Sequence, residues 1–420
     1  MCGSRHDPEV MHLNATLDLD VVAIEAQDQV SVLLELAAPA AETANPRPPS
    51  TLQVVLDRSG SMAGGALESA KSALIDLIGR LEPTDHFGLV LFDDEVNVAI
   101  PAAPLTDKDA VRAVIASIPP GGTTNLSGGY LRGLQEARRV AGAGGATLLL
   151  LSDGHANVGM TDAGKLGAVA ADARGHRITT STIGLGLGYD ESLLASLARG
   201  GAGNTHFAEE GDTAAAALAS EVDGLLTQVV QAASLTVRPD EAVESIALFN
   251  DLPMVGVESG FMVELGDFIS AEERKLLFEI EVPAMAALGL AQVCELELQW
   301  VELATMDTHK VTIPVNVNVV PGDEAAGRVA NPVVTTERAF QQAQRDKQAA
   351  TDALRAGNAP AAAAMYARAA DALRGFAEPE IREEAEVLRD LAQRSDYDDP
   401  ARTAKLSEAD GHRKSRRRGR

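Results

Sequence analysis

The chain has 420 residues, enough for two or three domains, and its apolar fraction of 45% is typical of globular proteins. Its formal net charge of −25 argues against a core that binds nucleic acid and suits cationic or metal partners. Aromatic residues make up only 3% of the chain, so the core is expected to rely on Leu, Val, Ile and Ala.

Cysteine usage and the N-terminus favour a reducing compartment. The two cysteines, Cys2 and Cys294, are too few for a disulfide framework, and Cys294 lies on the apolar side of an alternating stretch. The N-terminal MCGSRHDPEV lacks the apolar segment of a signal peptide. No stretch approaches the roughly 18 consecutive apolar residues of a membrane span. We therefore expect a cytoplasmic protein without a membrane span.

Residues 1–50 are expected to supply the first strands of a β-sandwich and a linker. Residues 12–42 alternate between apolar and polar side chains, with the valines and leucines of 30–36 largely on one face. This period of two predicts two half-buried strands. The segment ETANPRPPS (42–50) is rich in turn-forming residues and predicts the linker.

Residues 51–230 show short apolar strands that alternate with amphipathic helices. The strands include LQVVL at 52–56, a strand pair at 87–100 and TLLLLSD at 147–153. Strands that are apolar on both faces and separated by helices indicate a mostly parallel sheet covered on both sides. The strand pair adds one antiparallel edge strand. We therefore predict an α/β, doubly wound, Rossmann-like sheet.

The remaining chain predicts two further regions and a tail. Residues 231–320 return to a period of two and predict an antiparallel β-sandwich, which the N-terminal strands would complete. Residues 330–395 are Ala-rich and predict a helical hairpin with a third helix. Residues 396–420 read as a disordered tail with six positive charges at 413–420. A contact of this tail with anionic lipid, nucleic acid or an acidic partner is the alternative.

Two strands of the predicted sheet end in an aspartate. Asp57 follows LQVVL and Asp153 follows TLLLLS. Ligands of an open parallel sheet bind at the carboxyl ends of its strands, so the two carboxylates are expected to meet there. Two carboxylates in a nearly dry crevice both stay ionised only if they share a cation. Ser59 and Ser61, at alternate positions of a tight turn, add hydroxyl oxygens that suit Mg²⁺, with Mn²⁺ or Ca²⁺ as alternatives.

A glycine-rich loop is expected to contribute a further hydroxyl to this edge of the sheet. The glycine-rich PPGGTTNLSGG (119–129) offers the hydroxyl of Thr123 or Thr124, and Thr124 is favoured because Asn-Leu follows it and starts a helix. Taken alone, the serines after Asp57 also fit a helix N-cap. The acidic turn at 93–95 is expected to be a solvated hairpin turn rather than a cation site.

Three separated motifs resemble the von Willebrand factor A domain family: DRSGS (57–61), GGTTNL (121–126) and LLLSDGHAN (149–157). The resemblance covers about 51–230, and the flanking β segments and helices resemble bacterial relatives in which this domain is inserted into a β-sandwich. In the family these motifs form a metal-ion-dependent adhesion site. The resemblance implies that its members here are as follows: Asp57, Ser59, Ser61, Thr124 and Asp153. It also implies a vacant coordination position for a carboxylate of a partner protein.

We therefore expect a Mg²⁺-dependent protein-binding module that captures an Asp or Glu of its partner. The alternative is a subunit that works in trans with an AAA+ ATPase of the chelatase or MoxR type. We do not expect an enzyme, because a phosphatase of the haloacid dehalogenase type needs a second carboxylate two residues after Asp57, where Ser59 stands. His155 either lines the recognition surface or is an ordinary loop residue.

Overall fold

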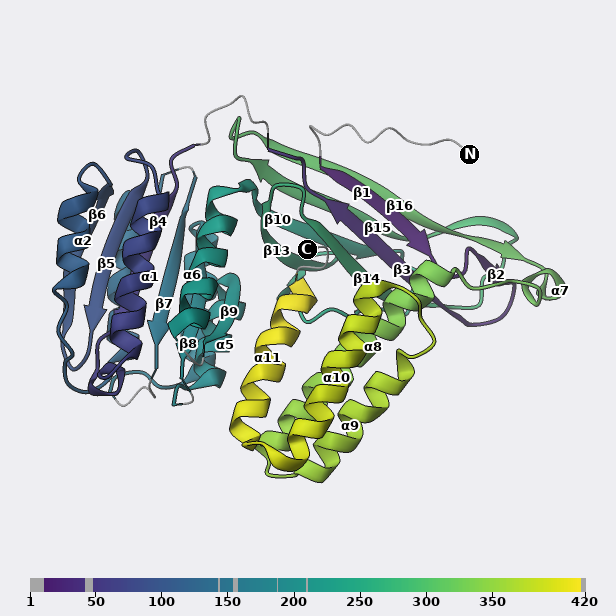
Figure 1. The fold of residues 1–420 in the computed structure, drawn as a ribbon. Helices are drawn as coiled ribbons and strands as arrows, with labels where there is room; N and C mark the ends of the chain where they lie inside the picture. Colours follow the sequence, from purple (N-terminus) through teal and green to yellow (C-terminus); the bar gives the residue numbers. More distant parts are fainter. Residues whose placement is uncertain are drawn as a thin grey trace.

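The computed structural model describes residues 11–41, 48–142, 144–153, 158–186, 188–208 and 211–416. These ranges form an α/β unit, a β-sandwich and a C-terminal helical unit, which lie side by side in Figure 1. None of the helices within these ranges combines the length and the apolar character that a membrane span requires.

The α/β unit is built on a six-stranded sheet with the order β6-β5-β4-β7-β8-β9. Its strands are β4 (Thr51–Asp57), β5 (His86–Phe92), β6 (Val96–Pro104), β7 (Ala146–Ser152), β8 (Ile178–Leu185) and β9 (Ala202–Ala208). Every neighbouring pair is parallel except β5 and β6, which are antiparallel. The predicted doubly wound sheet with one antiparallel edge strand is confirmed.

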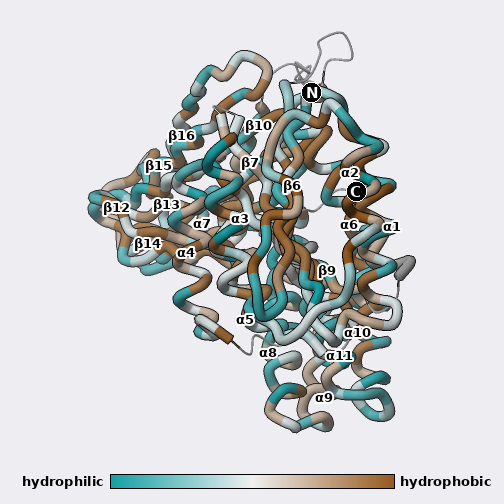
Figure 2. Tube along the Cα trace, turned by 90° about the vertical axis from the view of Figure 1, so that its left-hand side faces the viewer, coloured by the Kyte–Doolittle hydropathy of each residue, from teal (hydrophilic) through white to brown (hydrophobic). Residues whose placement is uncertain are grey.

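Helices cover both faces of this sheet. One face packs against α1 (Ala66–Arg80), α2 (Lys108–Ala116) and α6 (Gly211–Leu226), and the other against α3 (Leu126–Val140), α4 (Ala163–Gly175) and α5 (Glu191–Gly200). The strands are buried on both sides, which explains their continuous apolar sequences. Figure 2 shows these apolar strands in brown at the centre of the molecule.

The β-sandwich is formed by segments on both sides of the α/β unit in the sequence. The four-stranded sheet has the order β1 (His12–Leu17), β3 (Asp28–Ala37), β14 (Glu273–Val282), β11 (Ser245–Leu248). The six-stranded sheet has the order β12 (Met254–Val257), β13 (Gly260–Ile269), β10 (Gln228–Pro239), β15 (Gly289–Glu302), β16 (Thr308–Val320), β2 (Val21–Ala23). The α/β unit is therefore inserted between β3 and β10.

The two sheets share one apolar core. It includes Val30, Val32, Leu34 and Leu36 of β3, the face predicted from the alternating pattern. The middle of the opposite face of β3 is also buried, because Leu33 packs with a small cluster that includes a residue of the helical unit. The helical unit therefore covers part of the outer face of the four-stranded sheet.

The sandwich contacts the amino-terminal edge of the α/β sheet. Thr179, near the start of β8, donates a hydrogen bond to Asp267 at 2.9 Å. Gln231 of β10 donates to the carbonyl of Gly144, just before β7, at 3.0 Å. Since the strands run away from these contacts, the carboxyl-terminal edge lies at the other end of the sheet.

Within the described residues, the helical unit has two helices more than the three that the sequence predicted. It contains α7 (Gly322–Ala325), α8 (Pro332–Arg355), α9 (Ala359–Ala372), α10 (Pro379–Tyr397) and α11 (Pro400–Arg416). The prediction of a disordered tail from residue 396 is wrong for α11, whereas 417–420 lie outside the described residues. Lys414, which the sequence assigned to the basic tail, forms ion pairs with Glu384 at 2.5 Å and Asp410 at 3.2 Å.

Helix α11 packs through polar contacts, which is why composition did not predict it. Its Glu408 pairs with Arg355 of α8, and its Asp410 pairs with the buried Lys347 of the same helix. Ser407 lies 2.8 Å from Thr351 of α8, oxygen to oxygen. These contacts are made by polar side chains with residues that are distant in the sequence. The local sequence of α11 therefore shows no apolar periodicity that would predict it.

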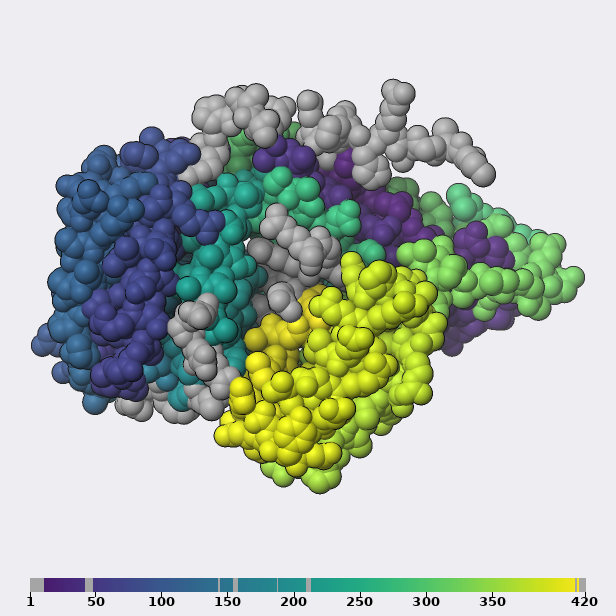
Figure 3. Space-filling view, in the orientation of Figure 1, coloured from purple at the N-terminus to yellow at the C-terminus, as the bar shows by residue number. Residues whose placement is uncertain are grey.

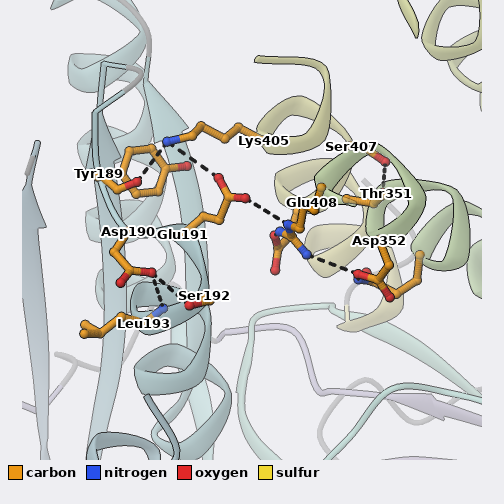
Figure 4. A network of polar contacts seen from close by, with 12 residues as sticks. Tyr189, Asp190, Glu191, Ser192, Leu193, Thr351, Asp352, Lys405, Ser407 and Glu408 are labelled. Atoms are coloured by element: carbon orange, nitrogen blue, oxygen red, sulfur yellow. Dashed lines mark hydrogen bonds and ion pairs between the residues drawn. The ribbon is translucent and has the colours of Figure 1, made fainter. Parts of the chain in front are cut away.

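The same helix contacts the α/β unit through Lys405 (Figure 4). The ammonium of Lys405 donates to the carbonyl of Tyr189 at 2.9 Å and lies 3.8 Å from the centre of its ring. It is also 3.5 Å from Glu191, which pairs with Arg355. Burial lowers the pKa of Lys405. Figure 3 shows the yellow helices lying against the teal part of the α/β unit.

We predict that Lys405→Met loosens α11, because the Tyr189 carbonyl loses its charged donor and Glu191 keeps only Arg355. The free energy of opening of α11 is expected to fall by about 1–3 kcal/mol, measured by hydrogen exchange. Lys165→Met, on the exposed surface of α4, is the control. Unchanged protection of α11 in Lys405→Met would contradict the assignment.

Candidate metal site at the carboxyl edge of the sheet

The two aspartates predicted at strand ends lie on neighbouring strands. Asp57 is the last residue of β4, and Asp153 directly follows β7. The pairing of Leu56 with Leu151 places Asp57 beside Ser152. Ser152 donates a hydrogen bond of 2.6 Å to one oxygen of Asp57, and both residues are fully buried. The carboxylate of Asp57 is thus held between β4 and β7.

The turn after β4 carries the two predicted serines toward Asp153. The backbone N–H of Ser59 donates to the other oxygen of Asp57 at 2.8 Å, which closes the turn. The hydroxyl oxygens of Ser59 and Ser61 are 3.1 Å apart, and Ser61 donates to Asp153 at 2.8 Å. Four of the five predicted residues therefore form one hydrogen-bonded group, in which the Ser59 backbone N–H provides the link to Asp57.

The glycine-rich loop lies against this turn. Gly60 donates its backbone N–H to the carbonyl of Gly122 at 2.8 Å, and Gly121 donates to the carbonyl of Arg58 at 2.6 Å. Thr124 is buried, with 3% of its surface exposed, whereas Thr123 is exposed. The two threonines of the loop therefore differ in burial. The role of Thr124 as a metal ligand stays a prediction.

Asp93 differs from the sequence expectation. The acidic turn was expected to be solvated, and Asp94 and Glu95 are exposed, but Asp93 is buried. Its carboxylate pairs with Arg58 at 3.0 Å, and its carbonyl accepts from the N–H of Asn125 at 2.8 Å. A Cβ on Gly121 would overlap this carboxylate, so only glycine fits there. Asp93 therefore holds the glycine-rich loop in place.

Sequence reasoning also missed Ser152. The signal was present, since Ser152 is the one polar residue between an apolar run and Asp153 in TLLLLSD. Its meaning depended on the register between β4 and β7, which the sequence does not give. His155, a candidate for the recognition surface, lies outside the described residues together with the rest of 154–157.

The electrostatics of the site fit a divalent cation. Burial raises the pKa of Asp57 above its usual range, and the nearby Asp93 adds to the rise. Burial also raises the pKa of Asp153, with a contribution from the charge of Asp57. A cation among these oxygens would restore the charged form of both groups, and carboxylate and hydroxyl oxygens suit a hard ion such as Mg²⁺. The residues that could hold it are as follows: Asp57, Ser59, Ser61, Thr124 and Asp153.

Comparison with known proteins identifies the family of the α/β unit. Residues 52–221 match the family model of the von Willebrand factor type A domain. The α/β unit of this chain is a von Willebrand factor type A (VWA) domain. Domains of this family commonly mediate protein interactions, often through a metal-ion-dependent adhesion site that binds a divalent cation.

Bacterial relatives resemble the chain beyond this domain. The protein sll0103 of Synechocystis sp. is 27% identical over 371 residues, which cover 84% of each chain. YfbK of Escherichia coli is 28% identical over 247 residues, which cover 57% of this chain and only 43% of YfbK. The chain is a VWA-domain protein of bacterial type with additional β-sheets and C-terminal helices.

A solved structure shares the whole fold. The von Willebrand factor type A protein from Catenulispora acidiphila has a TM-score of 0.74 to this chain and covers 92% of it, with 91% of its own length matched. At 16% identity, this similarity concerns the fold alone.

The two threonines allow a matched test of the site. We predict that Thr124→Ala weakens Mg²⁺ binding by about 10- to 100-fold, as expected for a ligand or a group that orients one. Thr123→Ala is the control and is expected to bind Mg²⁺ as the wild type does. Calorimetric titration measures both. Equal effects of the two substitutions would remove Thr124 from the site.

We predict that Asp57→Asn stabilises the metal-free protein. The folded-state pKa of Asp57 is raised, so its contribution to stability is fully present below the ordinary value of 3.8 and is lost as pH rises through the folded pKa. The thermal midpoint in EDTA should therefore be higher for Asp57→Asn at neutral pH, by about 2–4 °C per kcal/mol. The difference should shrink at acidic pH.

With Mg²⁺ bound, the wild type is expected to be more stable than Asp57→Asn. At a Mg²⁺ concentration of about 100 Kd the wild type should gain about 2.7 kcal/mol, and Asp57→Asn much less. A variant that is less stable than the wild type in EDTA at every pH would show that Asp57 is stabilising without a cation.

Proposed function

We propose that this protein is a Mg²⁺-dependent protein-binding module, in which the metal ion at the carboxyl edge of the VWA sheet captures an Asp or Glu side chain of a partner protein. Mn²⁺ and Ca²⁺ are the alternative ions. Asp57, Ser59, Ser61, Thr124 and Asp153 would hold the ion, and the partner's carboxylate would complete its shell.

One observation carries the proposal: the hydrogen-bonded group that runs from Asp57 through Ser59 and Ser61 to Asp153. It joins two carboxylates from different strands with hydroxyls, and burial opposes the charge of both carboxylates. No basic side chain among the described residues forms an ion pair with Asp57 or Asp153. A bound cation supplies the compensation that the protein does not.

A binding role without catalysis and a cytoplasmic location are parts of the same proposal. The absence of a second carboxylate two residues after Asp57 supports binding over phosphatase chemistry, because Ser59 cannot serve as the acid or base. Cys294 is a free, buried thiol, which suits a reducing compartment. Expression with a compartment-specific thiol probe tests the location.

The decisive experiment is calorimetric titration of Mg²⁺ and Mn²⁺ into the full chain and into the double variant Asp57→Ala/Asp153→Ala. The wild type is expected to bind one ion, and the double variant is expected to show at least a 100-fold loss of affinity, because both carboxylates are gone. Asp94→Ala, in the exposed part of the acidic turn, is the control. An ion that binds the double variant as tightly as the wild type would refute the site.

A further inference from the structure

The carboxyl edge of the sheet has two different borders beside the candidate metal site. The segment after β7 contributes Val158 and Met160, which are 43% and 37% exposed. We call this pair the apolar rim. The turn after β5 contributes the exposed carboxylates of Asp94 and Glu95, which we call the acidic rim.

The apolar rim is held against the candidate ligand loop. Val158 donates its backbone N–H to the carbonyl of Thr124 at 3.2 Å. Met160 donates its N–H to the hydroxyl of Ser127 at 2.8 Å. Gly159, between them, has a φ of 83°, and a Cβ there would lie 2.3 Å from the Ser127 hydroxyl. The backbone is thus fixed by polar contacts while the two apolar side chains face solvent.

The acidic rim is placed beside the same loop from another strand. A Cβ on Gly122 would lie 2.2 Å from a carboxylate oxygen of Asp94. The carbonyl of Gly122 accepts from Gly60 in the turn that carries the two serines. Because β5 and β7 lie on opposite sides of β4, the strands that precede the two rims flank the strand that ends in Asp57. The border of the site is therefore asymmetric in charge and in polarity.

From this asymmetry we propose that the partner segment carries an apolar side chain on one side of its metal-binding Asp or Glu and a Lys or Arg on the other. The apolar side chain packs on Val158 and Met160, and the basic side chain pairs with Asp94 and Glu95. This inference rests on the proposed function, since the metal-bound carboxylate fixes the segment between the rims. The occupant is an extended segment of a partner protein.

Physical reasons favour this composition. The chain has a net charge of −25, so a purely acidic segment would be repelled on approach, and a basic neighbour offsets that repulsion. Covering the exposed Val158 and Met160 side chains with a partner removes apolar surface from water, which favours binding. A segment with an acidic, an apolar and a basic side chain can bind the metal, the apolar rim and the acidic rim at the same time.

Selection from a displayed peptide library tests the proposal. The library has a central Asp or Glu with random flanking residues, is bound to the full chain in Mg²⁺ and is eluted with EDTA. Selected peptides are expected to be enriched in an apolar residue on one flank and in Lys or Arg on the other. One selected peptide is then measured by fluorescence polarisation against the variants below.

A double-mutant cycle assigns each flank to its rim. Replacing the peptide's apolar residue by Ser should weaken binding to the wild type about tenfold and binding to Val158→Ser/Met160→Ser hardly at all. Replacing its basic residue by Gln should weaken binding to the wild type about two- to fivefold at low salt, and less to Asp94→Asn/Glu95→Gln. Calorimetric Mg²⁺ binding checks that each double variant keeps its metal site.

The outcomes separate the two proposals. If no selected peptide needs both its acid and the divalent ion, the proposed function fails. If acid-dependent, EDTA-sensitive peptides appear without flanking preferences, or the cycles show no coupling, the proposed function stands and this inference is overturned. Apolar peptides that bind equally well in EDTA also overturn it, because the apolar rim would then act without the metal.

Discussion

The candidate site depends on the burial of one carboxylate, Asp57, at the end of a central strand. Its oxygens are occupied by the Ser152 hydroxyl and by the Ser59 N–H, and those two contacts fix the strand end and the turn that follows. The turn orients Ser61 toward Asp153. Because burial opposes the charge of Asp57, positive charge brought to this place would stabilise its ionised form.

The features of the fold and of the candidate site that could be predicted are those that depend on short stretches of sequence. Continuous apolar strands interrupted by helices gave the parallel sheet, and the alternation in β3 gave the inward face of the sandwich. Asp57 and Asp153 were recognisable because each is the first charged residue after an apolar run. These features follow from a period of two or from an abrupt change of polarity, and either is visible in a short window.

The parts that were missed depend on contacts between distant segments. Ser152 acts on Asp57 through the register of β4 and β7, and Asp93 acts through an ion pair with Arg58 across two loops. Helix α11 has a polar buried side, with Thr403, Lys405 and Ser407 all buried. The composition of this segment therefore resembles that of a disordered tail. In the fold, the polar side chains of α11 find their partners in charged residues of α8 and α10 and in the carbonyl of Tyr189.

The insertion of the VWA domain into the sandwich determines how a force would pass through the domain. The chain enters the domain at Thr51 and leaves it at Leu226, next to Gln228 of the sandwich, and the sandwich contacts lie at that same edge of the sheet. The candidate site lies at the opposite ends of the strands. A tensile force between a captured partner and the sandwich would therefore run along the strand axes. Hydrogen bonds between β4, β5 and β7 would then be loaded together in shear rather than opened one at a time.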